Sequence, residues 1–196
     1  MFRKSTLLVS ALALMLLAPL AHAAKGDVNL GVGGGLLMPL SDFKDVAKMG
    51  FLGALDMDYM VTDAVALGVD AMYSKNSAKD DLVTFLGVDE ASVTMLAGGG
   101  HVKYMFPMAA ESKIMPYVVG GGGIYHVTFK AELAGASDSD SENKFGGRGG
   151  VGMNFKAGEK LNVNAEANFH VVSTSDASTK FATFRVGVSF PLTGAK

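Results

Sequence analysis

The sequence predicts an all-β fold, an eight-stranded antiparallel up-and-down transmembrane barrel. Residues 161–171 alternate without a break between apolar and polar side chains, which is the period of an extended strand with one apolar and one polar face. The same alternation recurs along the chain behind a secretory type of N-terminus, and the chain contains no cysteine. Although 49% of the residues are hydrophobic, no segment after the N-terminus is an apolar run of spanning length, as expected for a barrel.

Residues 1–23 are predicted to be a secretory signal peptide. Arg3 and Lys4 provide a positive start, an apolar run covers residues 7–17, and the tripeptide Ala-His-Ala at 21–23 fits the small-x-small cleavage pattern. The apolar run is shorter than the roughly 20 residues that a membrane-spanning helix needs. The sequence therefore predicts cleavage near Ala23 and one mature barrel domain over residues 24–196.

Eight strands are expected, near residues 27–37, 50–60, 64–73, 90–106, 115–130, 144–156, 161–171 and 179–190. The connections near 62–64, 107–113 and 157–159 are short, and those near 38–49, 74–89, 131–143 and 173–178 are mostly longer and more polar. Short turns at one end and longer loops at the other are typical of outer-membrane barrels. The glycines at 98–100 are a candidate β-bulge that would switch the faces of the fourth strand.

The strand count, the signal and the last strand together resemble the small OmpA/OmpX-like outer-membrane barrels, over roughly residues 25–190. In the last strand, the residues that look like this family's C-terminal assembly signal are Phe184, Val186, Gly187, Val188 and Phe190. The six residues that follow from Pro191 depart from the family pattern. The resemblance implies a location in the cell outer membrane, recognition by the barrel assembly machinery, and contact with outer-membrane lipid and lipopolysaccharide.

Charged and polar side chains that face inward by parity form the candidate site. They are Asp56, Asp58, Asp70, His126, Arg148, Glu166 and Arg185. Isolated charges in a narrow lumen are costly unless they are paired. The expected turn centres place Glu166 opposite Arg185 and Arg148 diagonal to Glu166. Two interpretations remain open, a structural plug of ion pairs and a selective or gated polar pathway.

Several motifs are better explained by structure than by chemistry. Residues 147–152 match G-x-G-x-x-G, but a strand pattern follows them instead of the helix that a dinucleotide site needs. The acidic run at 138–142 is expected to be a solvated surface loop, with weak cation or lipopolysaccharide bridging as the alternative. His126 and Thr128 share a face, as in a lipid hydrolase, but no carboxylate that would orient the imidazole is evident. No cofactor or metal site is predicted.

A ring of outward aromatic side chains is expected near the strand ends, at the membrane interfaces. Its candidates are Tyr59, Tyr73, Tyr104, Tyr117, Phe155 and Phe190. A net charge of −2 and a pI of about 6.1 exclude a basic field for nucleic acid.

The primary hypothesis for function is a non-enzymatic, monomeric barrel that stabilises the envelope and meets lipopolysaccharide, host or phage surfaces through its loops. A narrow channel for small solutes or ions is the alternative, and a lipid A-modifying enzyme is the third hypothesis. Eight strands leave an interior just wide enough for side chains, so a general diffusion porin is not expected.

Overall fold

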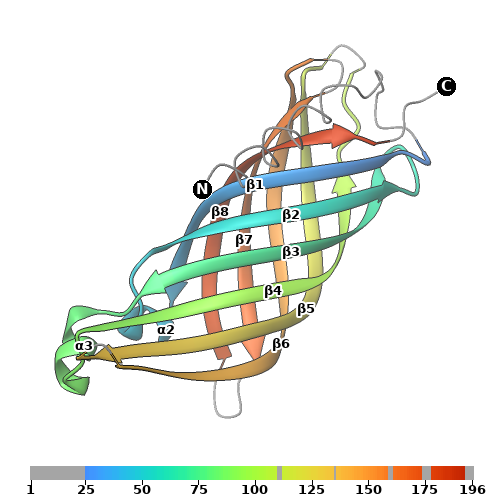
Figure 1. The fold of residues 1–196 in the computed structure, drawn as a ribbon. Helices are drawn as coiled ribbons and strands as arrows, with labels where there is room; N and C mark the ends of the chain where they lie inside the picture. Colours follow the sequence, from blue (N-terminus) through green and yellow to red (C-terminus); the bar gives the residue numbers. More distant parts are fainter. Residues whose placement is uncertain (1–24, 110–111, 135, 159–160, 174–177, 193–196) are drawn as a thin grey trace, which may run out of the picture.

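The strands of the computed structural model close into one antiparallel barrel, in which each strand pairs with the next and β8 pairs with β1 (Figure 1). The structure describes residues 25–109, 112–134, 136–158, 161–173 and 178–192, so the expected signal peptide and its cleavage site lie outside the described residues. The strands are β1 (Val28–Leu40), β2 (Gly50–Met60), β3 (Val65–Ser77), β4 (Glu90–Met105), β5 (Ile114–Leu133), β6 (Ala136–Lys156), β7 (Asn162–Ser173) and β8 (Ser178–Pro191). Two short helices, α2 (Phe43–Val46) and α3 (Asp80–Leu86), lie in the connections after β1 and β3.

The predicted fold class is confirmed, and the alternation of the sequence explains it. On β7, Asn164, Glu166, Asn168 and His170 are buried in the lumen while Phe169 is exposed on the outside. On β5, the outward residues stay apolar or glycine from Ile114 to Ile124, close to the roughly 9–11 residues with which a tilted strand crosses a bilayer. No helix in the described part of the chain is long and apolar enough to span a membrane.

The two ends of the barrel differ. The connections from β2 to β3, from β4 to β5 and from β6 to β7 share one end with the start of β1 and the finish of β8, and we call it the turn end. The other end, the loop end, carries α2, α3 and the β5–β6 connection, toward which β4, β5 and β6 sweep together in Figure 1. The expected loop at 131–143 is wrong, because β5 and β6 stay paired as far as Leu133 and Ala136.

Two further expectations about the strands are corrected. The fourth strand contains no bulge, since β4 pairs without interruption with both β3 and β5 through its glycines. The faces of β5 are reversed, because Tyr117, Val119 and Tyr125 are buried inside while His126 is exposed. The physical reason is that the lumen takes apolar side chains near both ends, and that β5 continues beyond the apolar belt, where its outward residues are polar. Alternation alone therefore did not indicate which face of β5 is the inner one.

The predicted belt of outward aromatic residues near the strand ends is confirmed only in part. Tyr59, Tyr73 and Tyr104 are exposed on the outer face, and Phe155 and Phe190 are half-buried there, whereas Tyr117 belongs to the lumen.

An apolar layer closes the lumen at the loop end. Phe43 of α2 folds back over the barrel and packs edge-on against Phe181 of β8, with ring centroids 6.4 Å apart. Around this contact lie the buried residues Leu37, Ala47, Leu52, Ala54, Met72, Val93, Met95, Ala97, Tyr125 and Val172. We call these residues, with Phe43 and Phe181, the apolar plug. Below it, His170 stacks on Phe181 and lies between Tyr125 Oη at 3.0 Å and Thr183 Oγ1 at 3.1 Å.

Inward glycines let β4, β5 and β6 approach closely, and this predicts a pair of contrasting variants. A Cβ atom on Gly121 would lie 2.5 Å from the Gly100 carbonyl oxygen, whereas one on Gly120 would meet nothing within 4 Å. Gly121→Ala is expected to lower the free energy of unfolding by about 1–3 kcal/mol through overpacking. The matched control Gly120→Ala should unfold like the wild type in urea, followed by circular dichroism in detergent micelles. Equal effects would contradict the assigned faces of β5.

The lipid face of β7 gives a second test. Ala165 points outward and Asn164 inward. Ala165→Arg should cost about 2–4 kcal/mol of unfolding free energy, because it places a cation among acyl chains near the middle of the membrane. Asn164→Ala should be milder when both variants are unfolded from lipid vesicles, and equal costs would show that the faces of β7 are reversed.

Candidate functional site: a chain of charges across the lumen

Eight charged side chains of alternating sign form a continuous chain across the middle of the lumen. They are contributed by β2, β3, β4, β6, β7 and β8, and none lies next to its partner in sequence. The contacts, in order, are Arg148 Nη2 to Asp70 Oδ1 at 2.7 Å, Asp70 Oδ1 to His101 Nδ1 at 2.8 Å, His101 Nε2 to Asp58 Oδ1 at 2.7 Å, Asp58 Oδ2 to Lys103 Nζ at 2.6 Å, Lys103 Nζ to Asp56 Oδ2 at 3.4 Å, Asp56 Oδ1 to Arg185 Nη1 at 2.9 Å, and Arg185 Nη2 to Glu166 Oε1 at 3.0 Å. We call this set the charge chain.

The position of His101 determines its protonation. Each of its two ring nitrogens lies within 2.8 Å of a carboxylate oxygen, from Asp58 on one side and Asp70 on the other. A carboxylate only accepts hydrogen bonds, and an imidazole donates from both nitrogens only when it is protonated. His101 is therefore a cation, and the four acids of the chain are balanced by four bases.

At the Glu166 end of the charge chain, two neutral side chains donate hydrogen bonds to the Glu166 carboxylate. Tyr117 Oη donates to its Oε2 at 2.7 Å, and Asn168 Nδ2 donates to its Oε1 at 2.7 Å. These bonds occupy carboxylate oxygens that Arg185 alone would leave partly unsatisfied. Burying an ion pair is favourable only when such additional hydrogen bonds complete it.

The small residues of neighbouring strands make room for the charges. The Cβ atom of any residue but glycine at position 68 would collide with the His101 ring and lie 2.5 Å from Asp58 Oδ1. A similar overlap with the Asp56 carboxylate exists at Gly31. The high glycine content on the inner face thus provides the volume that the charge chain occupies.

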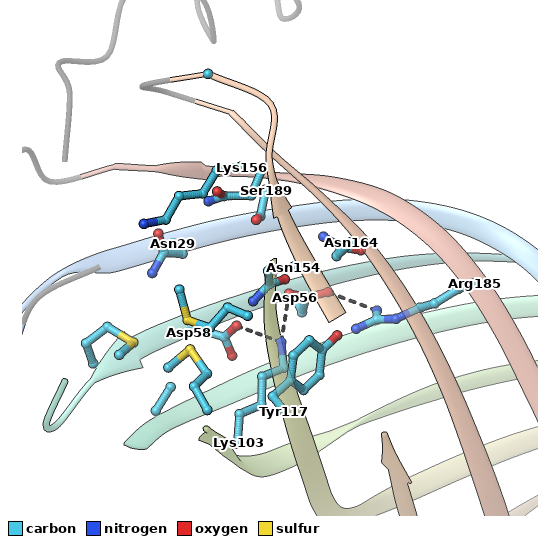
Figure 2. Close-up of a pocket in the computed structure, with 16 residues that line it drawn as sticks. Asn29, Asp56, Asp58, Lys103, Tyr117, Asn154, Lys156, Asn164, Arg185 and Ser189 are labelled. Atoms are coloured by element: carbon cyan, nitrogen blue, oxygen red, sulfur yellow. Dashed lines mark hydrogen bonds and ion pairs between the residues drawn. The ribbon is translucent and has the colours of Figure 1, made fainter. Parts of the chain in front are cut away.

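The charge chain leaves little space beside it on the loop-end side. The cavity between Arg148, His170, Thr183 and the apolar plug has a volume of about 10 Å³, which is about the size of one water molecule. Figure 2 shows the other side, where Lys103, Asp58, Asp56 and Arg185 form the floor of a larger cavity. Among the described residues, the lumen is consequently filled at the charge chain and at the apolar plug.

The match to known proteins agrees with this architecture. The model of the outer membrane protein beta-barrel domain matches residues 9–190. The chain belongs to this family of outer-membrane barrels. No curated protein sequence matches it.

Solved structures with the same fold are only distantly related in sequence. This outer-membrane barrel is 13% identical to Neisserial surface protein A, with 83% of this chain and 96% of that chain covered and a TM-score of 0.57. It is 13% identical to Ail of Yersinia pestis, with 86% and 99% covered and a TM-score of 0.60. It is 14% identical to OprG of Pseudomonas aeruginosa, with 89% and 100% covered and a TM-score of 0.53. Identities this low indicate the shared fold alone.

The structure brings together six of the seven site residues predicted from the sequence. Glu166 lies directly opposite Arg185, as the expected hairpin register required. Arg148 instead lies opposite His170, because the β6–β7 register is shifted by two residues from the expected one, and its partner is Asp70 across the lumen. His126 is the exception, since it is exposed on the outer face and contacts Asn143 Oδ1 at 2.9 Å. Its inclusion in the lumen was wrong, and the cause is the reversed parity of β5.

Sequence reasoning missed His101, Lys103 and Tyr117. The first two lie on β4, where the expected bulge obscured the parity, although the alternation of Val102 and Tyr104 with His101 and Lys103 contained the signal. Tyr117 was assigned to the membrane interface because tyrosine suits both places.

The residues of the expected assembly signal lie on β8. Phe184 and Val186 are exposed on the outer face, Val188 and Phe190 are half-buried there, and Gly187 faces inward. Their recognition by the assembly machinery stays a prediction.

The arrangement of the charge chain predicts coupled energetics for Glu166 and Arg185. Glu166→Ala should lower the free energy of unfolding by about 3–5 kcal/mol, because it leaves Arg185 buried with one fewer partner. The double variant Glu166→Ala/Arg185→Leu should cost less than the sum of the two single variants, by about 0.5–3 kcal/mol. Urea unfolding followed by circular dichroism measures this coupling, and Glu90→Ala on the exposed end of β4 is the control. Additive costs would contradict the pairing.

Proposed function

We propose that this protein is a non-enzymatic outer-membrane barrel with a sealed lumen that acts at the cell surface through the sheet projecting from its loop end. The observation that carries the proposal is the continuation of β5 and β6 beyond the apolar belt. Their pairing extends from Tyr125 and Lys144 to Leu133 and Ala136, and β4 joins them as far as Glu90. In the membrane the loop end would face outward, since the expected signal peptide and the turn end belong on the periplasmic side.

The projecting sheet has a free edge. Pairing between β6 and β7 begins only at Gly146 and Val172, so among the described residues the outer half of β6 has no neighbour on that side. An unpaired edge offers a row of backbone donors and acceptors to an extended segment of another protein.

The side chains along this edge define the partner that fits it. Asp138, Asp140 and Glu142 are exposed on the outer half of β6. Of these three, only Glu142 has a salt bridge to another described residue, Lys144 at 2.5 Å. Like charges would oppose pairing between two copies of the edge, which supports a monomer. A positively charged extended segment on a host, phage or envelope protein fits the edge best.

The filled lumen favours this role over the alternative of a narrow channel. A solute moving between the two ends would have to displace both the charge chain and the apolar plug. Each charge in the chain has at least one partner of opposite sign within 3.4 Å. Breaking such buried pairs costs several kcal/mol, which gives a high barrier to conduction.

The contacts of His126 and Thr128 do not support a lipid hydrolase activity. His126 contacts Asn143 and not a carboxylate, and Thr128 Oγ1 pairs with Ser141 Oγ at 3.0 Å. Contacts with outer-membrane lipid and lipopolysaccharide, and recognition of β8 by the assembly machinery, complete the proposed set of partners.

The sealed lumen predicts the absence of conductance. Wild-type barrel inserted into a planar lipid bilayer should show no current steps at moderate voltage. Phe43→Ala/Phe181→Ala together with Arg148→Ala should produce steps, because it removes two rings of the apolar plug and one end of the charge chain. Regular current steps in the wild type would favour the channel hypothesis.

The projecting sheet predicts charge-dependent binding. Fluorescence anisotropy should detect binding of a labelled peptide of alternating lysine and valine to the refolded barrel. The triple change Asp138→Ser, Asp140→Ser and Glu142→Ser should weaken it by about tenfold or more. The matched control, with Asp80, Asp81 and Glu90 changed to Ser, removes the same charge elsewhere on the loop end and should bind like the wild type. Equal weakening by both sets would indicate nonspecific attraction and contradict the edge as the binding site.

A further inference from the structure

A second cavity occupies the turn-end half of the lumen, and the charge chain forms its floor. The cavity has a volume of about 270 Å³ and reaches Gly158 in the β6–β7 turn, so it opens at the turn end. We call it the vestibule. This volume lies just below the roughly 300 Å³ at which pockets for drug-sized ligands begin. An occupant is therefore of about the size of a single sugar ring.

Four asparagines and a serine surround the vestibule. They are Asn29, Asn154, Asn162, Asn164 and Ser189, from β1, β6, β7 and β8. Asn154 lies opposite Asn164, and Asn162 lies opposite Ser189, so these side chains form one continuous rim. Figure 2 shows Asn29, Asn164 and Ser189 gathered above the ion-paired floor, with Lys156 beside them.

The rim has unused hydrogen-bonding capacity. Asn164 lines the cavity with only 9% of its surface exposed, and its amide faces that space without a hydrogen bond to another described residue. An amide that faces a narrow cavity gains hydrogen bonds from an occupant that offers both donors and acceptors, so the rim favours such a molecule.

The charges at the floor of the vestibule favour a neutral occupant there, although Lys156 also lines the cavity near the turn end. Asp56 and Asp58 are neutralised by Lys103 and Arg185 within the charge chain. Each asparagine offers both an acceptor and two donors, which is the combination that hydroxyl and amide groups match. The opposite wall holds the thioethers of Met60, Met105 and Met115, which suit the C–H face of such a molecule.

We propose that the vestibule is a binding site for a small neutral molecule rich in hydroxyl and amide groups, of the size of a monosaccharide. Because the lumen is filled beyond the charge chain, this molecule enters and leaves through the turn end. The site thus binds its ligand without conducting it. The site is separate from the projecting sheet, and only its single entrance rests on the sealed lumen of the proposed function.

Nuclear magnetic resonance of the wild-type barrel tests the site without any substitution. The ¹⁵N-labelled protein is refolded in lauryldimethylamine oxide, a detergent without a sugar headgroup, and titrated with N-acetylglucosamine. We expect saturable shifts of the side-chain amide signals of Asn154, Asn162 and Asn164, and none for Asn143 on the outer face. Absence of saturable shifts at the rim, with N-acetylglucosamine and with glucose, overturns the proposal.

Two variants and a charged probe complete the test. Asn164→Leu and the less buried Asn154→Leu keep side-chain volume but remove the amide, and each should weaken binding by about tenfold or more. Asn143→Leu is the matched control and should bind like the wild type, with heat-modifiable gel migration as the check that each variant is folded. Binding that is insensitive to both rim variants overturns the site. Glucuronate binding about tenfold tighter than glucose, and losing that advantage in Lys156→Gln, overturns the neutral class of ligand.

Discussion

The interior of this barrel depends on one constraint, which is that every charge placed in the lumen must meet a charge of opposite sign. An eight-stranded barrel has room for side chains and little else, so a lone carboxylate or guanidinium would lose its hydration without replacement. The alternating order from Arg148 to Glu166 satisfies this requirement with partners from six strands. The protonated His101 is essential to it, because it separates Asp58 from Asp70, which would otherwise repel each other.

The same constraint explains the distribution of glycine. Charged side chains occupy the lumen at one level only if neighbouring positions are empty, and Gly31 and Gly68 provide that space. Larger side chains there would displace Asp56 and His101 and interrupt the charge chain. The glycines are consequently part of the interior network, although they make no polar side-chain contact themselves.

The charge chain also divides the barrel into two compartments with different surroundings. On the loop-end side the apolar plug, with Phe43 folded back from α2, fills the lumen with apolar side chains. On the turn-end side the vestibule keeps an amide rim above an ion-paired floor. The barrel thus carries recognition chemistry at both ends, with a filled layer between them that keeps the two ends independent.

The sequence by itself determined the class of fold, the number of strands and the inward position of most of the charges. These properties follow from a period of two, which is local. The pairing of Glu166 with Arg185 was also predicted, from the expected centre of the β7–β8 turn, and it is confirmed. It did not determine the inner face of β5, the continuity of β4, or the partner of Arg148. Those depend on contacts between residues far apart in the chain, such as Asp70 with Arg148, and on a two-residue change of register that leaves every parity intact. Only the closed barrel, which brings β3 and β6 to opposite sides of one narrow lumen, decided which charges meet.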